Sequence, residues 1–361
     1  MQLTQAAIER YLTRLLATPI QVQQVQTLGG SMGATALKAL GYGQPLRIDF
    51  VRADVVERVV LHQITRNGFG RERDADQIAE VWLNHATFNR LPRHVAALDR
   101  VALTAEGELE PAGQIQELLL LTRYAPGQVY ADDLIRIREA RVCQELDQCR
   151  ARALAIYLAE IHMVTHDDPL LWRRRLRDLI GHGEGIMGLT DSYPTDFALA
   201  TSDDLRAIEE AANRWRWRLK PLTHRLAQVH GDFHPFNILF QDGVEFQLLD
   251  RSRGEWGEPA DDVSCLAINY LFFSLQAFGT LTGPFAQLYH IFWESYLAQR
   301  PDPELLRVIQ PWFAWRALVL ANPHWYPTLA DPVRRQLLTF ARRLLATEEF
   351  QWQAVNQYWE E

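Results

Sequence analysis

Two different hydrophobic patterns divide this chain, and the division constrains the fold more than any other feature. Between residues 21 and 64, β-branched residues alternate with polar ones and glycines interrupt the pattern, which predicts antiparallel strands with tight turns. Beyond residue 128 the apolar residues recur with helical spacing, and one long amphipathic helix is predicted over residues 139–162. We therefore expect an α+β fold with a small antiparallel β-rich N-terminal lobe, residues 1–123 including a leading helix, and a larger, mainly helical C-terminal lobe, residues 124–361.

Composition narrows the class of protein. The chain has 361 residues, enough for a sizeable core, and a net charge of −8, which argues against general binding to nucleic acid. Its three cysteines make neither a disulfide framework nor a zinc pattern. The amphipathic N-terminal segment does not resemble a signal peptide, and no apolar run has the length of a membrane span. These features predict a cytoplasmic enzyme without nucleic-acid or membrane partners.

The candidate catalytic and metal-binding residues lie in two stretches: "VHGDFHPFNILF", residues 229–240, and "LLDRSRGEWGEPADDV", residues 248–263. Asp232 is followed five residues later by Asn237, and an apolar strand then ends at Asp250. Phosphoryl transfer from a nucleotide needs a carboxylate that receives the proton of the attacking hydroxyl, and oxygen ligands for the metal that bridges the phosphates. We therefore predict that Asp232 is the catalytic base and that Asn237 and Asp250 bind Mg²⁺.

These segments resemble the aminoglycoside phosphotransferase and choline kinase-like families, which have a protein-kinase-like fold. "HGDFHPFN" is similar residue for residue to their catalytic motif, and "GEPADDV" resembles the segment whose Asp, here Asp262, braces the catalytic loop. "LAEIH", residues 158–162, and "RYAPGQ", residues 123–128, resemble weaker family features. The resemblance implies a bilobal kinase with ATP or GTP as co-substrate, Mg²⁺, and a small lobe that covers the nucleotide.

One departure concerns the residue that clamps the nucleotide phosphates. The family carries a Lys on its third strand, and His62 stands at that position. Histidine is mostly neutral near pH 7 and is a poorer clamp. Lys38 is an alternative from a neighbouring strand, and a surface lysine is the competing interpretation. The glycine-bearing turn before Lys38 also offers backbone N–H groups to phosphate. The predicted nucleotide-binding residues are Gly29, Gly30, Ser31, Lys38 and His62.

The helix expected over residues 74–91 normally supplies an acid to the missing Lys. Its register leaves three candidates open: Glu80, Asn84 and His85.

A second departure follows the metal-binding Asp250. Arg251 and Arg253 stand there, and they either contact phosphate or an anionic substrate or pair with Glu255 and Glu258. The segment before Pro259 is too short for a long phosphorylatable activation loop, which favours a small hydroxyl-bearing acceptor. Some bacterial stress-response kinases of this group resemble the same Asp-x-x-Arg arrangement, however, and they act on proteins.

The sequence thus predicts a Mg²⁺-dependent phosphotransferase that moves the γ-phosphoryl group of ATP or GTP to a hydroxyl of a small molecule. Two alternatives stay open: a nucleotide-binding pseudokinase without turnover, motivated by His62, and a Ser/Thr protein kinase. The acceptor, the choice of nucleotide, a second metal and the oligomeric state are not determined by the sequence.

Overall fold

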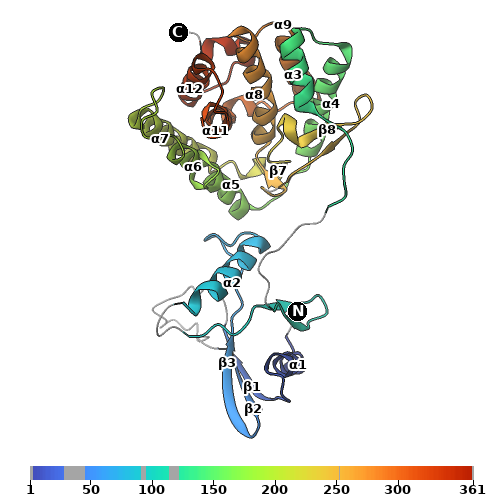
Figure 1. The fold of residues 1–361 in the computed structure, drawn as a ribbon, viewed down its shortest axis with the longest axis vertical. Coiled ribbons are helices and arrows are strands. Elements are labelled where there is room, and N and C mark those ends of the chain that lie inside the picture. Colours follow the sequence, from blue (N-terminus) through green and yellow to red (C-terminus); the bar gives the residue numbers. More distant parts are fainter. Residues whose placement is uncertain (1–2, 28–44, 91–94, 114–121, 252, 360–361) are drawn as a thin grey trace. The chain divides into compact units, whose positions relative to one another are not determined.

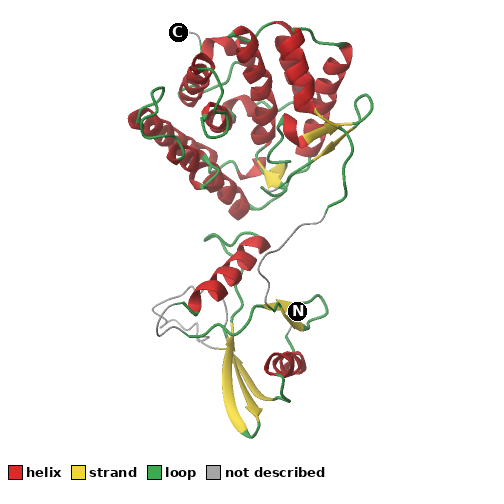
Figure 2. Ribbon diagram, in the orientation of Figure 1, coloured by secondary structure: helices red, strands yellow, loops and turns green. Residues whose placement is uncertain are grey.

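The computed structural model describes residues 3–27, 45–90, 95–113, 122–251 and 253–359. The chain divides into two compact units, Met1–Thr122 and Arg123–Glu361. Figures 1 and 2 show the elements of each unit.

The first unit contains a three-stranded antiparallel sheet in the order β1-β2-β3. Ala53 and Asp54, which join β2 to β3, both have positive φ (47° and 66°), and this backbone suits the twist of a two-residue hairpin. The predicted run of antiparallel strands is therefore confirmed. The elements are α1 (Gln5–Leu16), β1 (Gln21–Thr27), β2 (Leu46–Arg52), β3 (Val55–Leu61), α2 (Asp74–Phe88), β4 (Val101–Leu103) and β5 (Leu109–Pro111).

The leading helix α1 covers this sheet. The Thr4 side chain accepts a hydrogen bond from the Ala7 amide and caps the helix, which satisfies one of the free N–H groups of its first turn. A small separate core joins the helix to the strands. Its buried residues are Ile8, Tyr11, Leu12, Ile20, Val22, Ile48, Phe50 and Leu109.

The second unit is mainly helical. Its elements are β6 (Gln128–Val129), α3 (Tyr130–Ala140), α4 (Glu145–His162), α5 (Pro169–Gly181), α6 (Ile186–Asp191), α7 (Ser202–Leu219), η1 (Thr223–Arg225), β7 (Ala227–Gln228), η2 (Pro235–Asn237), β8 (Ile238–Phe240), β9 (Phe246–Leu248), β10 (Trp256–Gly257), α8 (Pro259–Phe278), α9 (Gly283–Gln299), α10 (Leu305–Val308), α11 (Gln310–Ala321), α12 (Asp331–Leu345) and η3 (Trp352–Tyr358).

Helix α8 forms the centre of this unit. It is buried from Pro259 to Leu275, because this stretch is almost wholly apolar after its first turn, and it packs against α3, α9 and α11 (Figure 1). Two short antiparallel sheets, the three-stranded β6-β8-β9 and the two-stranded β10-β7, flank the loop that carries Asp232. Among the described helices, none combines the length and apolar character needed to cross a membrane.

The structure corrects the long helix predicted over residues 139–162. The segment is broken at Arg141, which has a left-handed φ of 57° and ends α3, and α4 begins at Glu145. Gln144 and Asp147 form reciprocal hydrogen bonds between side chain and backbone at the start of α4. Leu146, predicted to face the core, is 40% exposed. The periodicity of apolar residues does not reveal such a break, because a single left-handed residue leaves the apolar residues in their places along the chain.

A buried ion pair fixes the beginning of α8. Glu258 accepts hydrogen bonds from Arg225 Nε (2.8 Å) and Nη2 (2.6 Å), and it caps the amide of Ala260. Arg225 also donates to Asp302 and to Glu304, so its charge has three carboxylate partners. This pair holds the helix turn that presents Asp261 and Asp262.

Glu258→Ala should lower the free energy of unfolding by about 3–5 kcal/mol, because it leaves a buried guanidinium without one of its carboxylates. We expect the lower end of this range because Asp302 remains in contact with Arg225. The measurement is urea unfolding. Glu348→Ala is the matched control: its partner Arg218 is half exposed, and its loss should cost less than about 1 kcal/mol. Equal losses in the two variants would contradict the importance of the buried pair.

Candidate functional site

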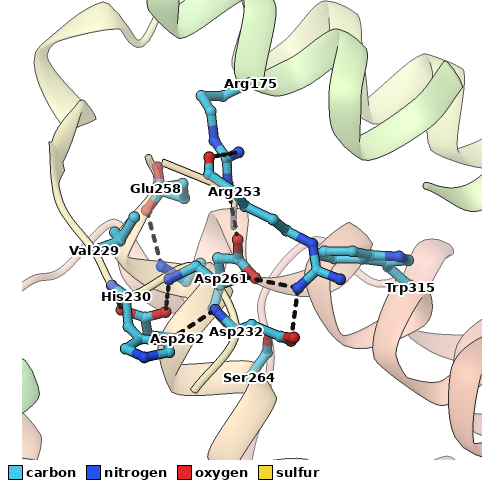
Figure 3. A network of polar contacts seen from close by, with 12 residues as sticks. Arg175, Val229, His230, Asp232, Arg253, Glu258, Asp261, Asp262, Ser264 and Trp315 are labelled. Atoms are coloured by element: carbon cyan, nitrogen blue, oxygen red, sulfur yellow. Dashed lines mark hydrogen bonds and ion pairs between the residues drawn. The ribbon is translucent and has the colours of Figure 1, made fainter. Parts of the chain in front are cut away.

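The loop of residues 229–234, called here the Asp232 loop, connects β7 to η2. Gly231 has a φ of +87°, and a Cβ there would lie 3.3 Å from the Arg253 Cβ, so the position favours glycine. The amides of His230 and Gly231 donate to Asp262 Oδ2 and Oδ1, each at 2.7 Å. This is the bracing contact that the resemblance implied for Asp262, and Figure 3 shows the two carboxylates of α8 beside the loop.

Asp262, which binds the amides of the Asp232 loop, also contacts a buried histidine, His162. His162 Nε2 lies 3.2 Å from Asp262 Oδ2, and His162 Nδ1 lies 2.8 Å from the hydroxyl of Tyr296. Burial acts to raise the pKa of Asp262, but contacts with His162 and His230 outweigh it and lower this pKa. Asp262 therefore holds the loop as an ionised carboxylate.

Asp232 has one oxygen in contact with two arginines. Its Oδ1 lies 2.7 Å from Arg316 Nη1 and 2.7 Å from Arg253 Nη1. Its Oδ2 lies outside both guanidinium contacts, 3.8 Å from His234 Nε2. Burial acts to raise the pKa of Asp232, but the charges of Arg316 and Arg253 outweigh it, and this pKa is lowered to about 2. The side chain is thus ionised at neutral pH, with one oxygen anchored.

The histidine beside Asp232 is neutral at neutral pH. Burial lowers the pKa of His234, and the neighbouring Arg316 and Arg253 add to this effect, although Asp232 opposes it. His234 also caps η2, because its Nδ1 accepts a hydrogen bond from the Phe236 amide (3.1 Å).

Arg316, which contacts Asp232, also binds a second carboxylate, that of Asp261. Arg316 Nη2 donates to Asp261 Oδ1 (2.6 Å) and to the carbonyl of Gly231 (3.1 Å). Arg175 Nη2 donates to the other oxygen of Asp261 at 3.2 Å. Sequence reasoning missed Asp261, Arg175 and Arg316. A signal existed for Arg316, which is a lone charge in the apolar stretch "WFAWRALVLA".

Arg251 and Arg253 both bind the Asp232 loop. Arg251 donates to the carbonyl of Val229 (2.9 and 3.2 Å), and Arg253 donates to the carbonyl of Gly231 (3.2 Å). Arg253 also lies 3.3 Å from the carboxylate of Glu184. The predicted alternative in which these arginines pair with Glu258 is wrong, because Glu258 instead binds Arg225. Arg251 lies 3.5 Å from the main-chain carbonyl of Glu255, the other acid of that alternative.

The two candidate metal ligands lie on one hairpin. Asn237 Nδ2 donates to the Asp232 carbonyl (3.1 Å), and the amide of Leu249 donates to the Asn237 carbonyl (2.9 Å). Asp250 lies two residues after the end of β9, and it is exposed with a φ of 50°. The described residues contain no cluster of three or more His, Cys, Asp or Glu suited to a metal. An amide oxygen and one carboxylate are hard donors, and this set fits Mg²⁺ that takes its other ligands from phosphates and water.

Of the predicted nucleotide-binding residues, the structure describes His62. Gly29, Gly30, Ser31 and Lys38 lie outside the described residues. His62 follows β3 directly and is exposed.

The first unit contains an ion pair that sequence reasoning did not find. Arg71, on the connection between β3 and α2, binds Glu80 of α2 through Nε and through Nη2 (2.8 Å to Oε1). Their side chains are 16% and 25% exposed. Glu80 was one of three candidates on this helix, with Asn84 and His85, for the residue that pairs with the family's Lys. Its partner in the structure is Arg71.

Comparison with known proteins identifies the family. Residues 62–309, more than half of the chain, match the model of APH, the phosphotransferase enzyme family. No curated protein is similar enough to match.

Solved structures similar to this chain include three kinases. A glucosamine kinase in complex with glucosamine, ADP and inorganic phosphate has 20% identity, covers 58% of each chain and has a TM-score of 0.40. An amicoumacin kinase, hAmiN, in complex with AMP-PNP, Ca²⁺ and Ami has 16% identity, covers 92% of each chain and has a TM-score of 0.43. The choline kinase LicA from Streptococcus pneumoniae has 14% identity, covers 94% of this chain and 98% of its own, and has a TM-score of 0.35.

The chain spans 57–58% of the length of the glucosamine kinases that it matches. The family match over residues 62–309 confirms the predicted protein-kinase-like fold with its small β-containing part and larger helical part. This chain belongs to the APH phosphotransferase enzyme family.

Proposed function

We propose that this protein is a kinase that transfers the γ-phosphoryl group of ATP or GTP to a hydroxyl group of a small molecule. The observation that carries the proposal is the state of Asp232. It is an ionised carboxylate with Oδ1 anchored by two arginines and Oδ2 outside those contacts, and Asn237 binds its backbone.

In the proposed step, the acceptor hydroxyl donates a hydrogen bond to Asp232 Oδ2. The hydroxyl oxygen forms a bond to the γ-phosphorus, the bond from that phosphorus to the bridging oxygen breaks, and the nucleoside diphosphate leaves. The hydroxyl proton passes to Asp232 and then to solvent. Since the pKa of Asp232 is about 2, the carboxylate is a weak base that mainly orients the hydroxyl, with the proton leaving late.

Asn237 and Asp250 are the residues that hold Mg²⁺ in this proposal. The ion, when bound, offsets the negative charge of the nucleotide phosphates. Asn237 is suited to this role because its amide nitrogen is engaged with the Asp232 carbonyl, which leaves the amide oxygen for a cation.

A small acceptor is favoured by the short segment between Asp250 and Pro259. Arg251 and Arg253 bind it to the Asp232 loop through main-chain carbonyls, so it does not form a long docking loop for a protein substrate. A cytoplasmic location is part of the same proposal.

The direct test uses purified full-length protein with γ-labelled Mg·ATP or Mg·GTP. The acceptors are amino sugars, amino alcohols, a Ser/Thr peptide mixture and water, and the measurement is transfer of label. We expect transfer to at least one small hydroxyl compound. Transfer to peptides alone favours the protein kinase, and nucleotide binding without any transfer favours the pseudokinase; either result overturns the proposal.

The residue that clamps the phosphates should be revealed by two substitutions. Lys38→Ala should raise the nucleotide KM or lower kcat more than His62→Ala does, because an ammonium is charged at pH 7 whereas an imidazole is largely neutral. Steady-state kinetics with varied nucleotide measures both effects. If both variants retain parental constants, neither residue clamps the phosphates.

Arg71→Met is the third variant in this series. In the parent protein the guanidinium of Arg71 pairs with Glu80 of α2, as the family's Lys pairs with the acid of the corresponding helix. An arginine also stays charged at neutral pH. A raised nucleotide KM in Arg71→Met, with parental values in the other two variants, assigns the clamp to Arg71.

A further inference from the structure

We propose that Arg316 is a positioning residue for the phosphoryl transfer: it anchors Asp232 Oδ1 so that Oδ2 faces the acceptor hydroxyl. This inference rests on the proposed function, and it assigns a role to a residue beyond the segment matched by the family model, which ends at residue 309.

The guanidinium of Arg316 joins three groups of the site. Nη1 lies 2.7 Å from Asp232 Oδ1, whereas Nη2 lies 2.6 Å from Asp261 Oδ1 and 3.1 Å from the Gly231 carbonyl. A planar guanidinium with donors in fixed directions determines where each partner lies. The Asp232 carboxylate is therefore held at one oxygen, and the backbone before it is held by the same group.

Arg316 is held in place by Asp261, which in turn binds Arg175. Asp261, which is fully buried, receives Arg175 Nη2 on its second oxygen, and Arg175 Nη1 donates to the Arg253 carbonyl (2.8 Å). The carboxylate of Asp261 thus connects α5, α8 and α11. A displacement of Arg316 would break its contacts with Asp261 of α8 and with the Asp232 loop.

An aromatic contact holds the plane of the guanidinium. Arg316 Cζ lies 3.9 Å from the ring centroid of Trp315, and Trp315 Nε1 donates to the Glu184 carbonyl (2.7 Å). Figure 3 shows Trp315 on one side of the charged cluster. Stacking on the indole ring restricts rotation of the guanidinium and adds a cation–π attraction.

Arg253 contacts the same oxygen but does not have the same role. Its side chain is 20% exposed and it has a second carboxylate, Glu184, within 3.3 Å, so it has an alternative partner near solvent. The Arg316 side chain is 7% exposed, and both of its carboxylate partners lie within the cluster. Arg316 is therefore the permanent anchor, whereas Arg253 has room to exchange partners.

The position of Arg316 in α11 also favours a functional role. The helix is apolar and buried on both sides of it. Taking a cation out of water is costly even when it is paired, and an apolar residue of similar size often serves stability equally well. A buried arginine that contacts the reactive carboxylate is better explained by the geometry it imposes.

The test compares Arg316→Ala with the parent in the phosphotransfer assay, using Mg·ATP and the acceptor that the panel identifies, or water. We expect kcat per folded molecule to fall about 10²-fold, the loss typical of a misplaced catalytic group, with the Kd for Mg·AMP-PNP unchanged. Guanidinium ion added at concentrations below those that unfold the protein should restore part of the lost kcat. A purely stabilising role predicts the opposite, because guanidinium weakens folded proteins.

Arg334→Ala is the matched control. Arg334 is a buried arginine of α12 that donates to the main-chain carbonyls of Ala321, Tyr326 and Leu329. Its loss should lower Tm but leave kcat per folded molecule at the parental value. If both variants lose kcat in parallel with Tm, or if Arg316→Ala keeps parental kcat, the inference is overturned.

Arg316→Lys covers the case in which Arg316→Ala does not fold. A lysine keeps the charge but lacks the fork that reaches both Asp232 and Asp261, so we expect a reduced kcat at unchanged nucleotide affinity. Parental kcat in Arg316→Lys overturns the inference. A parent that transfers phosphoryl to no acceptor and not to water overturns the proposed function, whereas an active parent with an unaffected Arg316 variant overturns only the positioning role.

Discussion

Asp232→Asn should lower kcat by about 10²–10⁴-fold, the usual consequence of removing a general base. The amide preserves the size of the side chain but removes the negative charge that orients the acceptor hydroxyl at Oδ2. The fold should survive, because Arg316 keeps Asp261 as a partner and Arg253 keeps Glu184. The measurement is the rate of label transfer from Mg·ATP or Mg·GTP, with nucleotide affinity determined separately and expected to be unchanged.

Asp242→Asn is the matched control for this experiment. Asp242 is exposed in the turn between β8 and β9 on the same hairpin. It should retain parental kcat. Near-normal turnover in Asp232→Asn would show that the reaction does not depend on this carboxylate.

Mg·ATP or Mg·GTP should stabilise the parent protein, and Asp250→Asn should lose this effect. A ligand that binds only the folded state stabilises it by about 2.7 kcal/mol when its free concentration is about 100 times its Kd, which appears as a rise in Tm. Asn is the better replacement than Ala, because Asp250 has a φ of 50° and Asn adopts this region more readily than most residues. Loss of the carboxylate removes the charged ligand from the proposed Mg²⁺ site.

Mg²⁺ alone and nucleotide with EDTA are the controls for the thermal measurement. Neither should reproduce the rise seen with the complete Mg·nucleotide. If neither Mg·ATP nor Mg·GTP raises the Tm of the parent, nucleotide binding itself is contradicted. If Asp250→Asn responds as the parent does, Asp250 is not a ligand of the metal.

The residues that the sequence singled out for the site lie close together along the chain. Asn237 binds the carbonyl of Asp232 across five residues, and the hairpin of β8 and β9 brings Leu249, the residue before Asp250, to the Asn237 backbone. Such contacts follow from the spacing of residues along a strand–loop–strand unit. The brace from Asp262 was also foreseen, although only through resemblance to a family, since it joins residues about thirty positions apart.

Helix boundaries were predicted less well. The sequence placed Glu139 and His162 on one helix, whereas the structure ends α3 at Ala140 and begins α4 at Glu145. A left-handed residue such as Arg141 leaves no mark on hydrophobic periodicity. The reciprocal cap formed by Gln144 and Asp147 was a signal, but two polar residues three apart also occur within helices.

The sequence by itself determined the two-part pattern of strands and helices, the family, and the order of Asp232, Asn237 and Asp250 along one hairpin unit. Only the tertiary structure decided that Arg316, 84 residues after Asp232, anchors one oxygen of that carboxylate, and that Asp261 and Arg175 hold the anchor. The reason is physical. Hydrophobic periodicity indicates which face of a helix is buried. The partner of a charged residue on that face depends on how α5, α8 and α11 pack together. The spacing of residues along the chain does not determine which helices pack against one another.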